Sequence, residues 1–125
     1  MRFLLDANCC IYLFSHAFPD LNRRVKATLA GEIGLSAVTF AEVAHGSERG
    51  LMPPPPALER LASQFPVLPF DEAAARVYAR LPFERGNFDR LLAAHAMSAG
   101  LAVITRNTRD FACLGDLDVE DWTQP

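Results

Sequence analysis

The chain has 125 residues, half of them hydrophobic, and its 12 basic and 15 acidic residues give a formal net charge of −3. This length and composition predict one domain with a sizeable core over residues 1–125. The negative balance excludes a broad basic surface that binds nucleic acid by neutralising many phosphates. A metal ion held among carboxylates would cancel much of the local negative field, so binding at a single such site stays open.

The N-terminal apolar stretch contains Asp6 and Asn8 and has no clear cleavage site, which argues against a signal peptide or a membrane segment. Cys9 and Cys10 are neighbours that could pair only through a strained ring, and Cys113 is left odd. We therefore expect a protein of the reducing cytoplasm, with no membrane association.

Short apolar runs alternate with segments in which apolar residues recur at helical spacing. Strands are expected at residues 2–5, 33–36, 67–68, 101–104 and 119–122. Helices are expected at residues 7–14, 20–30, 38–49, 57–64, 72–81 and 89–99. This alternation predicts an α/β domain with a mostly parallel sheet covered on both faces.

The segments between these elements have their own signals. Gly31 is expected to be the C-cap of the second helix, and Asp71 the N-cap of the helix that follows it. Four consecutive prolines, residues 53–56, cannot continue a helix and predict a stiff connector. Residues 82–88 are expected to form a loop.

Acidic residues follow several of the expected strands. Asp6 comes directly after the first strand, Glu42 in the first turns after the second, and Asp110 shortly after the fourth. Because the carboxyl ends of parallel strands meet at one edge of a sheet, these side chains are expected to converge there. Asp89 begins the helix that leads into the fourth strand and is assigned to the same edge.

Each acid also has a capping explanation. Asp6 has the position of an N-cap, Thr39 and Glu42 have the spacing of a capping box, and Asp89 and Asp110 suit first helical turns. For each acid taken alone, the capping explanation is at least as good as a functional one. Four acids in one cleft, however, would repel each other by a few kcal/mol per close pair. Bound Mg²⁺ or Mn²⁺, which prefer oxygen ligands, would turn that repulsion into attraction.

Such a site suits phosphodiester hydrolysis by a metal-activated water and needs no nucleophilic side chain or histidine base. The three histidines stand alone in sequence, which argues against a zinc site. Thr105 and Asn107 are expected to support the site by orienting a carboxylate or a water. Four arginines flank it in sequence and are candidates for binding RNA phosphates, or alternatively ordinary surface and ion-pair residues: Arg85, Arg90, Arg106 and Arg109.

Four segments have the character of family motifs: LLDAN at residues 4–8, LSAVTFAE at 35–42, FDRLLAAHA at 88–96 and ITRNTRDF at 104–111. In this order and at these separations they resemble the four motifs of the PIN domain. The variant is similar to VapC, the toxin of bacterial toxin–antitoxin pairs, and the similarity extends to VEDW at residues 119–122. It implies a single PIN-like domain with a parallel sheet of about five strands.

The resemblance also implies a function. It predicts a Mg²⁺- or Mn²⁺-dependent endoribonuclease that acts as a toxin, forms homodimers and is inhibited by a VapB-like antitoxin in a hetero-oligomer. Carried over by motif, the catalytic and metal-binding acids are Asp6, Glu42, Asp89 and Asp110, and Asp110 stands at the position that varies most. The segment between Tyr78 and Asp89 is shorter than in many VapC-like chains, so the loop beside the site is expected to differ.

Two other functions stay open. A phosphatase of the haloacid-dehalogenase kind uses an aspartate after the first strand as its nucleophile, but its second aspartate would be Asn8 here and no lysine is well placed. The other is a PIN-like scaffold that binds RNA or protein without cutting it.

The remaining marked residues are aromatic or histidine. Tyr12, Phe14 and Phe18, with the proline connector, could line an apolar groove for an antitoxin segment or belong to the core. His45 and His95 are expected to be structural.

Overall fold

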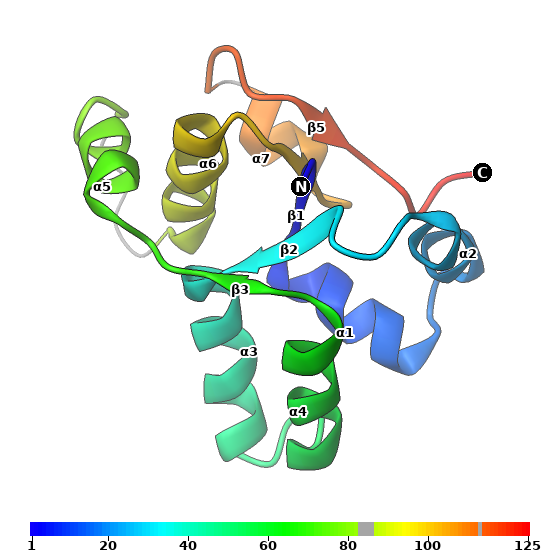
Figure 1. The fold of residues 1–125 in the computed structure, drawn as a ribbon. Helices are drawn as coiled ribbons and strands as arrows, with labels where there is room; N and C mark the ends of the chain where they lie inside the picture. Colours follow the sequence, from blue (N-terminus) through cyan, green and yellow to red (C-terminus); the bar gives the residue numbers. More distant parts are fainter. Residues whose placement is uncertain (83–86, 113) are drawn as a thin grey trace.

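The computed structural model describes residues 1–82, 87–112 and 114–125 (Figure 1), so the candidate Arg85 and the unpaired Cys113 lie outside the described residues. Its strands are β1 (Phe3–Leu5), β2 (Ile33–Ser36), β3 (Val67–Leu68), β4 (Ala102–Ile104) and β5 (Val119–Glu120). Its helices are α1 (Ala7–Ser15), α2 (Pro19–Ala27), α3 (Ala37–Glu48), α4 (Pro55–Gln64), α5 (Glu72–Ala79), α6 (Phe88–Ala99) and α7 (Thr108–Ala112).

The strands form one sheet in the order β3-β2-β1-β4-β5, and all of the pairings are parallel. The central strand β1 has Phe3 opposite Ile33 of β2 and opposite Ala102 of β4. The fold class expected from the alternating elements, a parallel α/β sheet of five strands, is confirmed.

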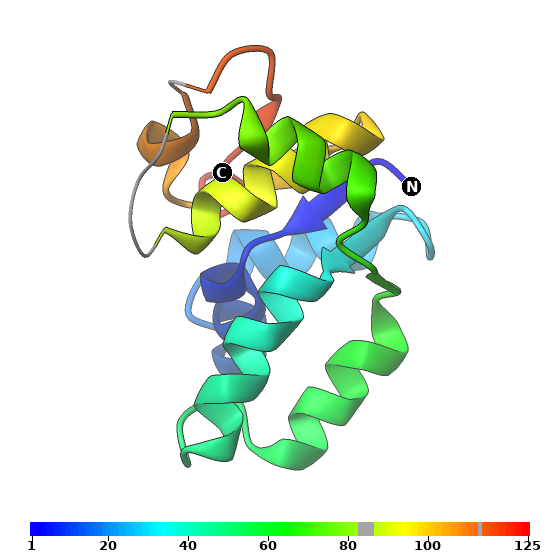
Figure 2. The same ribbon diagram turned by 90° about the vertical axis from the view of Figure 1, so that its left-hand side faces the viewer.

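The sheet lies between two layers of helices because successive residues of a strand point to opposite faces. Phe3 and Leu5 of β1 join a core cluster with residues of α1, α2, α3 and α4, whereas Leu4 joins a second cluster with residues of α6 and α7. Figure 2 shows the same division, with α3 and α4 on one side of β1 and α5 and α6 on the other. No described helix has both the length and the apolar character needed to cross a membrane.

Several helix ends differ from the sequence-based expectations. Helix α2 ends at Ala27 with Thr28 as its C-cap, so the assignment of Gly31 as that cap is wrong. Gly31 instead has a φ of 89° in the turn before β2, a conformation that suits glycine. Asp71 caps α5 as predicted, with its carboxylate accepting a hydrogen bond from Ala74 N at 3.0 Å.

The proline connector is shorter than expected because α4 starts inside it. Pro55 and Pro56 occupy the first turn of α4. A proline is tolerated there because the first N–H groups of a helix have no acceptor within the helix. The short helix α7 adds an element that is absent from the predicted series.

Candidate active site

Asp6 lies at the carboxyl end of β1 and is also the N-cap of α1. Its Oδ1 accepts a hydrogen bond from Cys9 N at 2.8 Å, and its Oδ2 accepts one from the Thr105 hydroxyl at 2.5 Å. The residue is only 6% exposed. The predicted capping role is therefore real, and a second contact from β4 fixes the other carboxylate oxygen in place.

The ends of three strands are tied together around this carboxylate. Asp6 N donates to Ile104 O at 3.1 Å, and Thr105 N donates to Glu120 O at 3.0 Å. The Thr105 hydroxyl accepts a hydrogen bond from Asn107 N at 3.0 Å while it donates to Asp6. Thr105 thus contacts the carboxylate directly and Asn107 contacts it through Thr105, and their supporting role in catalysis stays a prediction.

Glu42 on α3 and Asp89 on α6 are the two acids predicted to join Asp6 at this edge of the sheet. The pKa of Glu42 is raised from 4.5 to about 7, first by burial, then by the negative charge of Asp89, and then by that of Asp6. Both residues are half-buried. The charges of Asp89 and Asp6 thus reach Glu42, and the membership of these three acids in one metal site stays a prediction.

The capping box expected for Thr39 and Glu42 is wrong. The N-cap of α3 is Ser36, whose hydroxyl accepts a hydrogen bond from Val38 N at 3.1 Å. Helix α3 begins at Ala37, so Glu42 lies in its second turn, too far from the N-terminus to take part in capping. Its carboxyl is therefore placed for another role.

Asp110 differs from the other three acids in its exposure. It is exposed in the first turn of α7, and its carboxylate accepts a hydrogen bond from the Asn107 side chain. Its charge is not among those that raise the pKa of Glu42. The position of Asp110 therefore fits the simpler explanation, that it is an acid favoured in the first turn of a helix.

A divalent cation fits this donor set by its chemistry. All candidate ligands are carboxylate oxygens, which hard cations prefer, and the raised pKa of Glu42 shows that the acids lie in one another's negative field. In the described ranges, no three His, Cys, Asp or Glu residues are grouped so that they could hold a metal ion. Asp6 is already fixed, so binding would depend on side-chain rotation of Glu42 or Asp89.

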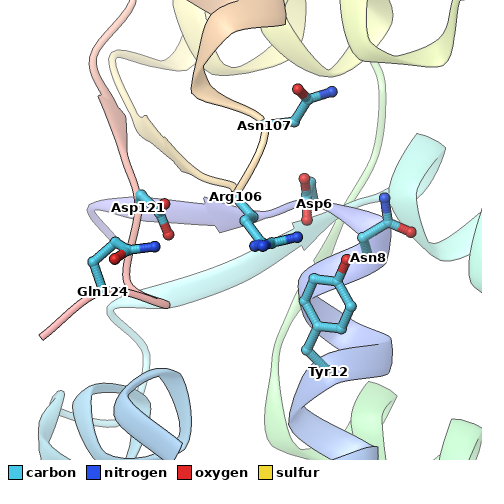
Figure 3. A pocket seen from close by; sticks show the side chains of 7 residues that line it. All are labelled: Asp6, Asn8, Tyr12, Arg106, Asn107, Asp121 and Gln124. Atoms are coloured by element: carbon cyan, nitrogen blue, oxygen red, sulfur yellow. The ribbon is translucent and has the colours of Figure 1, made fainter. Parts of the chain in front are cut away.

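A polar hollow of about 370 Å³ opens beside Asp6. Figure 3 shows its lining residues, which come from α1, the segment after β4 and the C-terminal end of the chain. They are Asp6, Asn8, Tyr12, Arg106, Asn107, Asp121 and Gln124. Most of these side chains offer hydrogen-bond donors, which suits a sugar or a phosphate group.

Arg106 brings positive charge to this polar hollow. Its guanidinium lies 4.8 Å from the centre of the Phe18 ring, and Phe18 packs edge-on against Tyr12 with ring centres 4.8 Å apart. In the part of the chain that the structure describes, Arg106 makes no ion pair with an acidic side chain. Of the other candidate arginines, Arg109 is exposed on α7 and Arg90 is half-buried on α6.

Four lining residues of the polar hollow are absent from the predicted site: Asn8, Tyr12, Asp121 and Gln124. Asn8 follows Asp6 by two positions, in the first turn of α1. Asp121 comes directly after β5, just as Asp6 comes directly after β1. The strand-end rule that identifies Asp6 misses Asp121 because the last strand is expected to run to residue 122, and nothing in the sequence marks Gln124.

The fold agrees with the family comparison. The family model described as the PIN domain matches residues 3–116, and the chain therefore belongs to the PIN-domain family.

Within this family the similarity is to VapC proteins. The chain is 33% identical to the tRNA(fMet)-specific endonuclease VapC of Shigella flexneri, over 98% of this chain and 99% of that protein. The VapC-like character predicted from the motifs is confirmed.

Solved structures give the same result. A chain of the DNA-bound VapBC structure from Salmonella typhimurium is 28% identical, with a TM-score of 0.83 and coverage of 98% of both chains. A chain of VapBC2 from Rickettsia felis bound to a promoter DNA fragment has the same fold, with a TM-score of 0.83 at 22% identity and coverage of 98% of this chain and 99% of that one.

Proposed function

We propose that this chain is a metal-dependent endoribonuclease that acts as the toxin of a toxin–antitoxin pair. The observation that carries the proposal is the buried carboxylate of Asp6 at the carboxyl end of β1, held by Cys9 N and the Thr105 hydroxyl in a chain of the PIN-domain family. The VapC proteins to which it is similar are named as endonucleases or ribonucleases. PIN-family membership gives no support to the alternative of a haloacid-dehalogenase-like phosphatase.

Each acidic residue has a distinct part in the proposed reaction. Mg²⁺ or Mn²⁺, when bound, supplies the charge that activates a water and shields the leaving oxygen. Asp6 is the fixed ligand, because Cys9 N and Thr105 hold both of its oxygens. Glu42 makes no hydrogen bond in the described part of the chain and can turn toward the ion, and Asp89 completes the set.

The polar hollow supports the binding of the RNA backbone. Arg106, held over Phe18, offers a guanidinium that can make charge-assisted hydrogen bonds to a phosphate next to the scissile bond. Asn107 positions Asp110, which we assign to the edge of the site as an auxiliary acid. Arg90 and Arg109 remain candidates for more distant phosphates.

The partners proposed are a VapB-like antitoxin, a second copy of the chain in a homodimer, and RNA. The similar structures from Salmonella typhimurium and Haemophilus influenzae are described as VapBC and VapBC-1 complexes. The free and buried Cys9 and Cys10 are compatible with action in the reducing cytoplasm.

Two variants of one residue test the proposal, because Asp6 combines a capping role with the proposed ligand role. Asp6→Asn keeps a side-chain oxygen for Cys9 N, whereas Asp6→Ala loses the cap at a cost of about 0.5–2 kcal/mol. We expect both variants to lose at least about a hundredfold in RNA cleavage, because a metal-site acid is missing from each. Only Asp6→Ala should melt at a clearly lower temperature.

The assay uses purified, antitoxin-free protein with total RNA in Mg²⁺, in Mn²⁺ and in EDTA. Cleavage that persists in EDTA or in Asp6→Asn would reject the metal-site proposal. Metal-independent RNA binding without cleavage would favour the scaffold, and hydrolysis of a phosphatase substrate would favour the phosphatase.

A further inference from the structure

A second hollow, of about 370 Å³, shares Glu42 with the acidic site. Its described lining residues are Ala41, Glu42 and His45 on α3 and Phe88 at the start of α6, and we call it the apolar hollow. Its volume is within the range of roughly 300–1,000 Å³ that is usual for small-molecule sites. The catalytic proposal uses Glu42 and gives no role to the other three residues.

Phe88 is the most unusual lining residue of this hollow. The side chain of this large aromatic residue is 52% exposed, and it directly precedes Asp89 in the first turn of α6. Asn87 caps this turn by accepting a hydrogen bond from Asp89 N at 2.9 Å, which fixes the backbone that carries the ring. An aromatic ring held in water beside an acidic site offers a flat apolar face to a ligand.

His45 supplies a polar group to the lining of this hollow. It lies three residues after Glu42 on α3, so both side chains point from the same face of that helix. The residue is exposed, and its ring can both donate and accept a hydrogen bond. The expectation that His45 is structural is thus not what its position indicates, whereas His95 is buried as expected.

The polar and apolar hollows are chemically different neighbours of one acidic site. Asp6 lines the polar hollow with Arg106 and side-chain amides, which suit phosphate and sugar groups. Glu42 lines the apolar hollow with Phe88 and His45, which suit a flat ring with polar edges. A nucleotide chain that enters both hollows would therefore pass the scissile phosphate over the acids.

We propose that the apolar hollow is a nucleobase subsite, in which a base next to the scissile phosphate stacks on Phe88 and hydrogen-bonds through its edge to His45. The inference rests on the proposed ribonuclease function. It also limits the substrate, because a base in this hollow has left its own strand's stack and its pairing partner. The substrate class is RNA that is single-stranded at the cleavage position.

The test measures binding without cleavage. A short single-stranded RNA that contains one 2-aminopurine is titrated with the protein in EDTA, and both anisotropy and 2-aminopurine fluorescence are followed. Wild type should quench the fluorescence when the probe base occupies the subsite. Phe88→Leu should abolish the quenching and raise Kd on the order of tenfold, since one stacked aromatic is lost. Phe88→Tyr, which keeps the ring, should restore both signals.

The matched control is Val67→Ala on β3, an exposed apolar residue outside both hollows, which should bind like wild type. Equal quenching and equal Kd in Phe88→Leu and wild type would overturn the proposal. It would also be overturned if Phe88→Leu left RNA binding intact while it changed the monomer–dimer balance or the affinity for purified antitoxin. In those cases the hollow serves a protein partner.

The failure of this inference is distinguishable from the failure of the proposed function. If wild type cleaves RNA in Mg²⁺ and Asp6→Asn does not, the nuclease stands whatever Phe88→Leu does. If Phe88→Leu also cleaves with an unchanged KM and the same preference for unpaired RNA over a duplex, the subsite is rejected alone.

Discussion

The pKa of Glu42 is shifted by its surroundings. Burial, Asp89 and Asp6, in that order, raise its pKa from 4.5 to about 7. At a pH between these two values, the Glu42 carboxyl is protonated in most folded molecules and ionised in most unfolded ones. The free energy of unfolding therefore falls as the pH rises from about 4.5 to about 7, and this contribution is constant on either side.

Glu42→Gln should remove this dependence. In EDTA, we expect the free energy of unfolding of wild type to be lower at about pH 8 than at about pH 5, with Glu42 contributing on the order of 1 kcal/mol after allowance for solvent screening. The glutamine variant should lack this contribution and be the more stable of the two at about pH 8. Urea denaturation at both pH values measures it, and equal pH slopes for the two proteins would contradict the charge assignment.

Asp110 provides a second prediction, because the structure separates it from the other acids. Its carboxylate is exposed and bonded to the Asn107 side chain, so it influences the site from outside. We expect Asp110→Asn to lower kcat/KM by about tenfold, at the low end of the roughly 10–100-fold range for residues outside the ligand set. The same assay on Asp89→Asn should show a loss at least ten times larger; equal losses would make Asp110 a full member of the acid group.

At the scale of elements, one buried hydrogen bond links the two helices that carry Glu42 and Asp89. The ring Nδ1 of His95 on α6 lies 2.7 Å from the hydroxyl of Ser36, the N-cap of α3. Burial lowers the pKa of His95, and the charge of Asp71 only partly opposes it, so the ring is neutral. Since the Ser36 hydroxyl already accepts from Val38 N, it satisfies both groups by donating to His95.

Ser36→Ala should therefore affect the reaction as well as stability. The lost cap costs about 0.5–2 kcal/mol, and α3 and α6 lose the bond that sets the separation of Glu42 and Asp89. We expect kcat to fall severalfold with little change in KM. Val25→Ala is the control, since it removes buried apolar atoms from α2, a helix that carries none of the proposed acids. It should lose similar stability and keep wild-type kcat; an equal fall in kcat would make the effect of Ser36→Ala a general one.

The elements themselves follow from the sequence because the apolar alternation is strong. The central strand has residues that pack on both faces, and Asp6 ends it abruptly, so both the strand and the site position are visible without the structure. The helix ends are less visible. Ser36 serves as the last residue of β2 and as the N-cap of α3, and this double role hides the true cap behind the fortuitous spacing of Thr39 and Glu42.

Which residues form the site is harder to predict from the sequence than where the site lies. Local sequence treats Asp89 and Asp110 alike, as first-turn acids near the fourth strand. Only the tertiary arrangement places the charge of Asp89 on Glu42 and leaves Asp110 outside. The contribution of Gln124 depends on the path of the C-terminal segment after β5, which no local pattern specifies.

At the scale of the whole molecule, the net charge of −3 restricts how RNA can be held. Binding by many phosphate contacts requires a broad basic surface, and a chain with more acidic than basic residues does not offer one. Arg106 is instead placed individually, by stacking on Phe18 beside the polar hollow. The proposed nucleobase subsite would add affinity that does not depend on charge.

A net negative chain with few arginines at the site predicts that RNA binding depends only weakly on salt concentration. For single-stranded RNA in EDTA, a plot of log K against log salt should have a slope no steeper than about −2, because each phosphate neutralised contributes about −0.7. Arg106→Gln should make the slope shallower by about 0.7, whereas Phe88→Leu should weaken binding at every salt concentration and leave the slope unchanged. Arg23→Gln is the control, since Arg23 already pairs with Asp20 on α2. A slope near −5 for wild type, or an unchanged slope in Arg106→Gln, would mean that the backbone is held by a basic surface elsewhere.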